Sequence, residues 1–391
     1  MSTVDIDVIN PVELSQRLIR CPSVTPHEGG ALDELQSVLE GLGFHCRRLL
    51  FSEEGTPDVD NLYARLGDMR PNFCFAGHSD VVPPGDRDGW GEDPFSGVII
   101  DGKLFGRGSS DMKSAIASFV SAAHRYILKV DEELPGSISL LITGDEEGPA
   151  INGTTKVLDW MSNNNEVIDA CIVGEPTNPD YLGQMIKIGR RGSFTGWLTV
   201  TGVQGHTAYP HLAENPLSKL VKMLEPLAEE QLDQGTEYFP PTTAAISSID
   251  TGNSATNVIP QKVTASFNIR FNDSRTAEDI EKWLRAHFDS VGANYTLETA
   301  CSSNAFITEP GALSDDLVSA VKAVVGVHPE MSTTGGTSDA RFIRKFCPVI
   351  EFGVVGKTMH KLNEHVEVKD VELLTDIYTE LLDRFFKRVN A

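Results

Sequence analysis

The sequence lacks the features of a secreted or membrane-spanning protein. Its six cysteines lie far apart and form no CxxC pair, which argues against a disulfide framework and favours reduced thiols. The longest apolar runs, such as residues 98–100 and 139–142, are far too short to cross a bilayer. Residues 1–7 contain no basic region leading into an apolar stretch, so no secretion signal is expected. Together these absences predict a cytoplasmic protein.

Positive charge is scarce as well. Lys and Arg number 33 against 56 Asp and Glu, which leaves a formal net charge of −23 at pH 7. Such a charge repels nucleic-acid phosphates and anionic membranes, so neither is expected as a partner. The chain also lacks the GxxxxGK[ST] pattern of a phosphate-binding loop. The simplest explanation of the acidic excess is that it keeps the protein soluble. Several of the carboxylates nevertheless lie at positions in the sequence that suit metal ligands.

The 391 residues, of which 40% are hydrophobic, suffice for two domains with buried cores. The first part of the chain alternates stretches of helical spacing with short apolar strands. The expected helices are 11–19, 30–42 and 114–130, and the expected strands are 73–76, 137–143 and 170–173. This alternation is typical of an α/β domain, in which functional groups gather at the carboxyl ends of the strands.

From residue 192 onward the order of expected elements becomes β-α-β-β-α-β, which is that of a ferredoxin-like unit. These elements are strand 194–203, helix 215–232, strands 244–249 and 258–271, helix 276–289 and strand 294–299. The alternation of helices and strands seen in the first part then resumes, with helix 315–325, strand 349–352 and helix 371–389. We therefore predict a catalytic domain of residues 1–191 and 304–391, with a mixed sheet flanked by helices, interrupted by a small domain of residues 192–303.

Histidine and acidic residues recur at the ends of the expected strands. His78 and Asp80 follow the strand 73–76. Because residues two apart in an extended segment share one face, His78 suits a metal ligand and Asp80 a group that orients the ligands. Asp111 lies in a glycine-bearing turn that opens the helix 114–130. Taken alone, His78 is more readily explained as a structural histidine, and Asp111 as an ordinary first-turn acid that complements the helix dipole.

Three further strand ends extend the pattern. Residues 145–147 are three consecutive acids, and like charges in a row cost free energy unless cations offset them. Glu175 follows the strand 170–173, and His360 follows the strand 349–352. His365 competes with His360, and spacing alone does not choose between them. Surface loops also carry acidic runs, so no single position indicates a metal site. The inference rests on the occurrence of histidines and acids at all five positions.

Two histidines and three carboxylates form a sensible ligand set for two Zn²⁺ ions that share one bridging carboxylate. Two dications outweigh three ligand carboxylates by one positive charge, which favours a bound hydroxide. One glutamate is left over to act as a general base. The sequence therefore predicts a hydrolytic two-metal site.

At these positions the chain resembles the co-catalytic zinc peptidase and deacylase family, which includes carboxypeptidases and aminoacylases. The likeness covers nearly the whole chain, including the inserted domain. It implies two zinc ions per subunit, with Co²⁺ as a possible substitute, and five ligands: His78, Asp111, Glu147, Glu175 and His360. Asp111 would bridge the two ions. The choice of His360 over His365 rests on this resemblance.

The resemblance also implies roles for the other two acids. Glu146 would be the general base that takes a proton from the attacking water, a choice over Glu147 that the spacing does not make. Asp80 would lie behind the ligands and orient them. His206 of the inserted domain would stabilise the oxyanion of a partner subunit, which implies a homodimer held by that domain. On residue type alone, His206 reads as a surface histidine in a turn.

Within the family, several stretches resemble the members that act on N-succinyl-LL-2,6-diaminopimelate. One is GGTSDARF at residues 335–342. The likeness implies hydrolysis of this small anionic acyl amino acid to succinate and LL-2,6-diaminopimelate, for lysine and cell-wall synthesis. Arginines suit a substrate with several carboxylates, because guanidinium binds carboxylate bidentately. The residues implied to bind it are Arg190, Ser193, Tyr209, Asn257, Arg270, Gly336, Thr337 and Arg341.

One stretch departs from those members. The loop before His360 reads FGVVGKTM at residues 352–359, where many of them have an asparagine near Gly356. Lys357 offers an alternative contact for an anion. The departure keeps open a related deacylase that acts on N-acetylornithine, or a carboxypeptidase. A binding protein without catalysis, and a reading of the acids as mere surface charge, are the alternatives from other classes.

Overall fold

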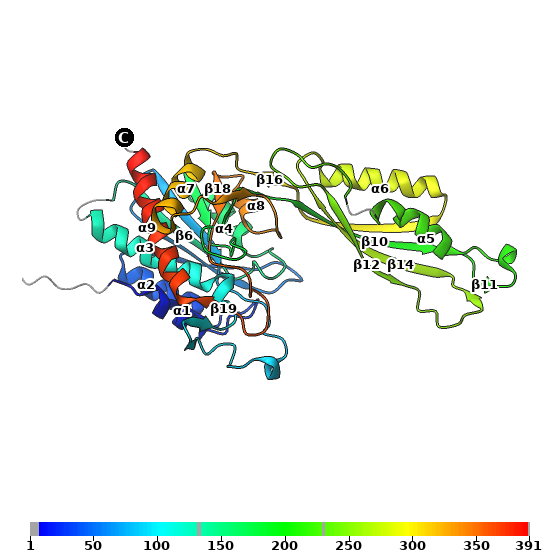
Figure 1. Ribbon diagram of the computed structural model, residues 1–391, viewed down its shortest axis with the longest axis horizontal. Helices are drawn as coiled ribbons and strands as arrows, with labels where there is room; N and C mark the ends of the chain where they lie inside the picture. Colours follow the sequence, from blue (N-terminus) through cyan, green and yellow to red (C-terminus); the bar gives the residue numbers. More distant parts are fainter. Residues whose placement is uncertain (1–7, 131–133, 229–230, 390–391) are drawn as a thin grey trace, which may run out of the picture. The chain divides into compact units, whose positions relative to one another are not determined.

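The computed structural model describes residues 8–130, 134–228 and 231–389. The chain divides into two compact units, of which the first comprises Met1–Ile188, Thr308–Met331 and Ser338–Ala391. The second comprises Gly189–Ile307 and Ser332–Thr337 and is therefore inserted into the first (Figure 1). Residues 1–7, for which the sequence predicts no secretion signal, lie outside the described residues.

The first unit is built on an eight-stranded sheet with the order β1-β2-β6-β3-β7-β18-β8-β17. The central strands β6, β3, β7 and β18 run parallel, whereas β1, β2 and β8 pair antiparallel with their neighbours. All residues of the four central strands are buried, as expected for parallel strands covered on both faces. The strands are β1 His45–Phe51, β2 Val59–Leu66, β3 Asn72–His78, β6 Ser137–Thr143, β7 Ala170–Val173, β8 Met185–Lys187, β17 Glu330–Ser332 and β18 Val349–Glu351.

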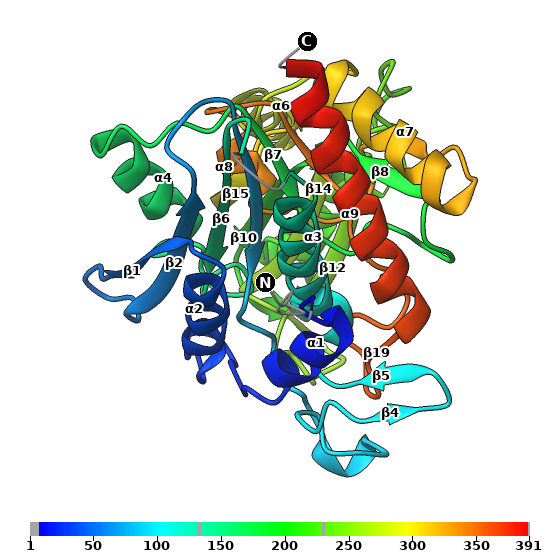
Figure 2. The ribbon, with the colours of Figure 1, turned by 90° about the vertical axis from the view of Figure 1, so that its left-hand side faces the viewer.

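Helices cover both faces of this sheet (Figure 2). They are α1 Pro11–Ile19, α2 Ala31–Gly41, α3 Ser114–Val130, α4 Thr154–Asn163, α7 Ala312–Val325, α8 Ala340–Ile343 and α9 Val368–Val389. Phe75 of β3 packs against Phe119 of α3 and Tyr378 of α9, with ring centroids 4.6 and 5.9 Å apart. The register places Tyr63 of β2 on the opposite face, where its ring lies 5.6 Å from that of Trp160 in α4. The alternation of side chains along each strand thus builds a core on either side.

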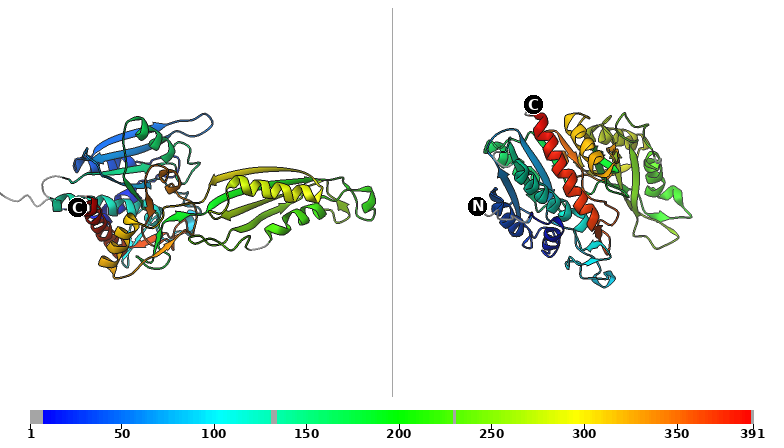
Figure 3. Two further views of the ribbon diagram at one scale, coloured as in Figure 1. Left: turned by 90° about the horizontal axis from the view of Figure 1, so that it is seen from above. Right: turned by 60° about the vertical axis from the view of Figure 1, so that its left-hand side comes forward.

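Helices α3 and α9 run side by side over one face of the sheet (Figures 2 and 3). A small separate sheet with the order β19-β5-β4 lies near the start of α3 in the chain. Its strands are β4 Ile99–Ile100, β5 Lys103–Phe105 and β19 His365–Glu367. Because β5 precedes the turn Ser109–Lys113 and β19 follows the loop with His360, their pairing brings these two segments together.

The second unit is a four-stranded antiparallel sheet, order β12-β14-β10-β15, packed against helices α5 and α6 (Figure 1). Its elements are β10 Gly192–Thr201, α5 Pro216–Leu224, β12 Thr243–Asp250, β14 Lys262–Phe271, α6 Ala277–Val291 and β15 Asn294–Ser303. In β14 every second residue is buried, which matches one face on the helices and one face open. This order is that of a ferredoxin-like unit, so the predicted α/β fold with a ferredoxin-like insertion is confirmed. Two short ladders accompany it: β9 Gly189–Arg190 with β16 Phe306–Ile307, and β11 Gly205–His206 with β13 Val258–Ile259.

Two prolines shorten elements that the sequence predicts to be longer. The predicted helix 215–232 ends as α5 at Leu224 and continues as a 3₁₀ turn, because Pro226 has no N–H and restricts the residue before it. Residues 229–230 of that prediction lie outside the described residues. The predicted strand 258–271 is interrupted at Pro260, which separates β13 from β14.

The segment Ser332–Thr337, placed in the catalytic domain by the sequence, clusters with the second unit. The hydroxyl of Thr333 donates to the carbonyl of Tyr238 at 2.6 Å, and Nη1 of Arg190 donates to the carbonyl of Gly336 at 3.2 Å. Within the part of the chain that the structure describes, no helix combines the length and apolarity needed to span a bilayer.

Candidate metal centre

The parallel strands of the first unit deliver most of the candidate ligands to one edge of the sheet. His78 is the last residue of β3, Glu147 and Glu175 follow β6 and β7, and His360 lies in the loop after β18. Carboxyl ends of parallel strands meet at the same edge, so these loops converge. Asp111 is the exception among the five expected strand ends. It follows β5 of the small sheet and lies in the turn Ser109–Lys113 before α3.

A first group of possible ligand atoms consists of His78, Asp111 and Glu175, all within 4.8 Å of one another. Nε2 of His78 lies 3.1 Å from Oδ1 of Asp111 and 3.8 Å from Oε1 of Glu175. The other ring nitrogen, Nδ1, lies 2.9 Å from the main-chain carbonyl of Asp80. That carbonyl can accept a hydrogen bond from a protonated Nδ1, which leaves Nε2 to bind a metal, the usual arrangement of a ligating histidine.

A second group consists of Asp111, Glu147 and His360, again with ligand atoms within 4.8 Å of one another. Nε2 of His360 lies 2.8 Å from Oε1 of Glu147 and 3.3 Å from Oδ2 of Asp111. His360 adopts a left-handed backbone with φ of +61°, which is uncommon for a residue other than glycine. His365 belongs to neither group. Its ring packs on Phe105 at 4.9 Å and its Nδ1 lies 2.9 Å from the carbonyl of Asn363.

The two groups share Asp111, with Oδ1 facing one group and Oδ2 the other. Ligands at about 2.0–2.1 Å from a tetrahedral zinc ion lie roughly 3.3 Å from each other. The distances from His78 to Asp111 and from His360 to Asp111, 3.1 and 3.3 Å, are close to that value. Imidazole nitrogens and carboxylate oxygens are also the donors that zinc accepts. The side chains therefore fit a pair of divalent ions bridged by one carboxylate.

The three consecutive acids after β6 have three different environments. Asp145 is buried, and its Oδ2 accepts hydrogen bonds from the N–H groups of Ile151 and Asn152, so it shapes the loop. Glu147 belongs to the second ligand group. Glu146 belongs to neither group.

Asp80 lies behind these groups and is buried. Its Oδ1 accepts a hydrogen bond from the N–H of Glu146 at 3.4 Å and its Oδ2 one from the N–H of Glu147 at 3.1 Å. Burial raises the pKa of Asp80 to about 6, while the charge of His78 and these N–H groups act against that rise. The carboxylate of Asp80 thus binds the backbone of the loop that carries Glu146 and Glu147, while its main-chain carbonyl contacts His78.

The charges of the groups are strongly coupled when no metal is bound. Burial alone would lower the pKa of His78, but the hydrogen bond to Asp111 and the surrounding carboxylates raise it well above its usual range. The hydrogen bonds to Asp111 and Glu147 raise the pKa of His360 to about 10. Burial opposes ionisation of Asp111, yet its two histidine partners hold its pKa well below the ordinary value. Burial and the charge of Glu175 raise the pKa of Glu146 well above its ordinary value.

An arginine cluster lies at one end of the second unit. Ser193 of β10 pairs with Arg270 of β14, and Arg190 is the last residue of β9, two positions before β10 begins. Burial and the charge of Arg270 lower the pKa of Arg191, which shows that the two guanidinium groups are close. Gly335 fits against this cluster because its φ is +100° and a Cβ there would lie 2.8 Å from Nη1 of Arg190. The neighbouring Gly336 and Thr337 belong to the same unit.

The other candidate substrate contacts of the second unit lie beyond the far end of β10. His206 belongs to β11, is exposed, and accepts a hydrogen bond on Nδ1 from the N–H of Ala208. The ring of Tyr209 lies 5.7 Å from that of His206, and the carbonyl of Asn257 accepts from the N–H of Thr207. His206, Tyr209 and Asn257 therefore form a separate cluster.

Two candidate contacts belong to the first unit. Nη2 of Arg341 lies 3.7 Å from Oδ1 of Asp339, and its guanidinium lies 4.3 Å from the ring centroid of Phe342. Lys357, the possible substitute for the expected asparagine, is mostly exposed and lies 3.5 Å from Asp180. A Cβ on Gly356 would lie 3.0 Å from the carbonyl oxygen of Pro176, so a larger residue there requires a shift of the loop.

Two buried charges near the ligands have no role in the sequence prediction. Arg107 and Glu364 form an ion pair whose side chains are 3% and 0% exposed. Neither spacing nor residue type signals this pair, because the two residues lie 257 positions apart in the chain. Only the pairing of β5 with β19 places them together.

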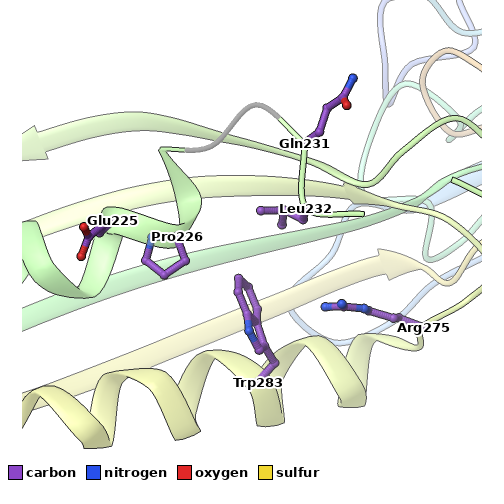
Figure 4. Close-up of a pocket in the computed structure, with 6 residues that line it drawn as sticks. All are labelled: Glu225, Pro226, Gln231, Leu232, Arg275 and Trp283. Carbon is purple, nitrogen blue, oxygen red and sulfur yellow. The ribbon is translucent and has the colours of Figure 1, made fainter. Parts of the chain in front are cut away.

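A pocket on the second unit is unrelated to these groups (Figure 4). The guanidinium of Arg275 lies 5.9 Å from the ring centroid of Trp283 there. The lining residues are Glu225, Pro226, Gln231, Leu232, Arg275 and Trp283, and no predicted site residue is among them.

Comparison with known proteins places these groups in context. Residues 74–384 match peptidase family M20/M25/M40. A succinyl-diaminopimelate desuccinylase from Rhodospirillum centenum is 60% identical over 377 residues, which cover 96% of this chain and 97% of that protein. The same enzyme from Rhodospirillum rubrum is 53% identical over 389 residues, covering 97% and 99% of the two chains.

Solved structures share the fold at low identity. An M20 family metallo-carboxypeptidase from Sulfolobus solfataricus has a TM-score of 0.76 at 17% identity, over 96% of this chain and 99% of that one. A dinuclear metal-binding peptidase of family M20 from Bacillus subtilis has a TM-score of 0.69 at 13% identity, over 96% and 98%. From its sequence match and its fold, the chain belongs to peptidase family M20/M25/M40.

Proposed function

We propose that this protein hydrolyses the amide of N-succinyl-LL-2,6-diaminopimelate to succinate and LL-2,6-diaminopimelate. One observation carries the chemistry: two ligand groups share Asp111. Glu146 belongs to neither group, and the charges of Glu175, His78 and Asp111 act on its carboxyl. The substrate assignment draws on the relatives of 53% and 60% identity, which are succinyl-diaminopimelate desuccinylases.

Two divalent ions, Zn²⁺ by donor preference with Co²⁺ as a substitute, would be held by the two ligand groups. Bound there, such ions lower the pKa of a water molecule and polarise a carbonyl oxygen. Asp111 would contact both ions, His78 and Glu175 one of them, and Glu147 and His360 the other.

Glu146 would act as the general base. It would accept the proton of the attacking water and then deliver it to the nitrogen of the leaving amine. A raised pKa suits both tasks, because a carboxyl with an ordinary pKa is a weak base at neutral pH and a poor proton donor to the leaving group. Asp80 would keep Glu146 in place through the N–H groups that it binds.

The arginine cluster would hold the carboxylates of the substrate. Arg190 and Arg270 are partly or fully buried in the second unit, and partial desolvation strengthens their attraction for an anion. Ser193 lies opposite Arg270 and adds a hydroxyl. The chain has a net charge of −23, so this cluster would be a locally positive region that attracts an anionic substrate.

We propose further that the enzyme acts as a homodimer. Ser193 and Thr201 lie at opposite ends of β10, about 26 Å apart at the usual rise per residue. The extended substrate has a chain two atoms longer than a tripeptide backbone and spans roughly 13 Å. One substrate therefore cannot contact both the arginine cluster and His206 of the same chain. A substrate bound by the arginine cluster of one subunit would instead meet His206 of the partner subunit. The imidazole of that histidine would donate the hydrogen bond that stabilises the oxyanion.

The cytoplasm is the proposed site of action. All six cysteines are free in the structure, which agrees with a reducing compartment.

The proposal is tested by incubating the zinc-loaded protein with N-succinyl-LL-2,6-diaminopimelate, N-acetylornithine and several N-acyl amino acids. Loss of the amide bond is followed by ultraviolet absorbance, with and without a chelator. We expect strong preference for the succinyl substrate and loss of turnover with the chelator. Preference for N-acetylornithine would move the assignment to the related deacylase, and chelator-resistant turnover would contradict the metal centre.

A further inference from the structure

The turn that carries Asp111 is held by one buried carboxylate. Oε1 of Glu364 accepts hydrogen bonds from the N–H groups of Gly108, Ser110 and Asp111, at 3.1, 2.9 and 3.2 Å. The main-chain carbonyl of Glu364 accepts a fourth bond, from Gly106 at 2.9 Å. The side chain of Glu364 has no exposed surface, so water does not compete for these bonds. One residue thus fixes the backbone on both sides of the turn.

The charge of Glu364 is balanced inside the protein. Its Oε2 accepts a hydrogen bond from Nη1 of Arg107, whose side chain is 3% exposed. The guanidinium of Arg107 also lies 5.3 Å from the ring centroid of Trp90 and donates to the carbonyl of Lys361 at 3.3 Å. The two opposite charges therefore add no net charge beside the metal centre.

Glu364 also connects two ligand loops. It lies four residues after His360 in the same loop, while its carboxylate binds the N–H of Asp111 itself. A second contact joins the same segments, because the hydroxyl of Ser110 donates to the carbonyl of Val355 at 2.9 Å. A shift of Glu364 would therefore move Asp111 and His360 relative to each other.

We propose that Glu364 is a positioning residue for the metal centre. With Arg107 as its counterion, Glu364 fixes the backbone of Asp111, so that one oxygen of the Asp111 carboxylate faces His78 and the other faces His360. This inference rests on the proposed metal centre. Because Asp111 is common to both groups, loss of Glu364 weakens both metal-binding events together. Groups that hold ligands in place typically contribute about 10–100-fold in metal affinity.

The test compares the wild type with Glu364→Gln and with the control Glu367→Gln. Both variants remove one carboxylate from neighbouring positions, but Glu367 is half-exposed and lies 3.7 Å from Lys103, outside the centre. Binding of Zn²⁺ to the metal-free proteins is measured by calorimetry, and visible absorption is recorded after Co²⁺ loading. We expect Glu364→Gln to weaken both binding events about 10–100-fold and to change the Co²⁺ spectrum. Glu367→Gln is expected to match the wild type in both.

The outcomes separate the inference from the metal centre itself. A wild type that binds no pair of ions would contradict the metal centre. A wild type that binds two ions, together with a Glu364→Gln variant of unchanged affinity and spectrum, would overturn the positioning role alone. A lower unfolding midpoint of the metal-free variant without these changes would indicate a merely structural residue and overturn it too.

A measurement on the wild type covers the case in which Glu364→Gln does not fold. Hydrogen exchange of the peptide that spans residues 106–111 is followed in the metal-free protein by mass spectrometry. Slow exchange of the N–H groups of Gly108, Ser110 and Asp111 supports the inference, because the carboxylate then holds the turn before any metal arrives. Fast exchange of these groups overturns it.

Discussion

The carboxylate of Asp80 accepts a hydrogen bond from the main-chain N–H of Glu147 at 3.1 Å, while its own main-chain carbonyl lies 2.9 Å from Nδ1 of His78. One residue therefore touches a member of each ligand group, but through different atoms. The carbonyl orients the imidazole of His78, and the carboxylate positions the loop of Glu147. The sequence predicts the orienting role of Asp80, and the structure divides that role between main chain and side chain.

We expect Asp80→Asn to keep the orientation of His78, since the main-chain carbonyl is unchanged. One of its two side-chain acceptors becomes a donor, which opposes the N–H of Glu146 or of Glu147. The expected result is a drop in kcat of about 10–100-fold with two metal ions still bound, because groups that orient ligands contribute on this scale. Steady-state kinetics and metal analysis check it. Loss of one ion would instead show that the carboxylate matters for binding at His78.

Glu146→Gln removes the proposed base and leaves all five ligands intact. We expect kcat to fall by about 10²–10⁴-fold, the usual contribution of a general base, while both metal ions stay bound. Turnover is measured on the succinyl substrate, with metal content determined on the same sample. Near-normal turnover with both ions bound would exclude Glu146 as the base and direct attention to Glu147.

Metal uptake is expected to release protons. His78 and His360 both carry raised pKa values in the metal-free protein, about 10 for His360, whereas a metal requires the neutral imidazole. At pH 7.5 we expect about two protons to leave when both sites fill, and affinity to fall as the pH is lowered. Calorimetry in buffers of different ionisation enthalpy measures the number. A value near zero would contradict protonated histidines in the metal-free site.

The same raised pKa predicts how the metal-free protein responds to pH. A histidine whose pKa is higher in the folded than in the unfolded state stabilises the fold fully below the unfolded value of 6.5, and this stabilisation is lost as the pH rises through about 10. The free energy of unfolding of metal-free wild type should therefore fall more between pH 6.5 and 10 than that of His360→Asn. Urea unfolding at several pH values measures both. Identical pH dependence would refute the contribution of His360.

Mixed dimers test whether His206 acts on the partner. Glu146→Gln and His206→Ala are co-expressed with different affinity tags, and dimers with one copy of each are purified. If His206 serves the other subunit, each mixed dimer contains one complete site and regains about half of the wild-type activity. If His206 acts within its own chain, the mixed dimer has no complete site and stays as inactive as the parent variants.

Arg270→Lys keeps the positive charge and removes the planar fork of donors. We expect KM for the succinyl substrate to rise about 10–100-fold, since a charged hydrogen bond contributes about 1.5–3 kcal/mol. Arg275→Lys is the matched control, because Arg275 belongs to the same unit but contacts Trp283. Equal effects of the two substitutions would contradict a substrate contact at Arg270.

Periodicity and local chemistry predict most of the fold. The apolar run at 73–76 and the helical spacing at 114–130 are local features, and the structure contains β3 and α3 at these positions. The order β-α-β-β-α-β likewise follows from patterns within a few residues. Two errors occur at Pro226 and Pro260, where a missing N–H ends an element whose hydrophobic pattern continues. A third is the assignment of Ser332–Thr337 to the catalytic domain.

Only the tertiary structure decides which histidine and which acids belong to the candidate metal centre. His360 and His365 lie five positions apart in similar surroundings of sequence, and the pairing of β19 with β5 turns His365 toward Phe105. The three acids at 145–147 are equivalent in sequence, but Asp145 turns to the N–H groups of its own loop. Such choices depend on contacts between distant segments, which local propensity does not encode. The pairing of Arg107 with Glu364 is the clearest case, because a carboxylate that holds the turn of Asp111 comes from the other end of the chain.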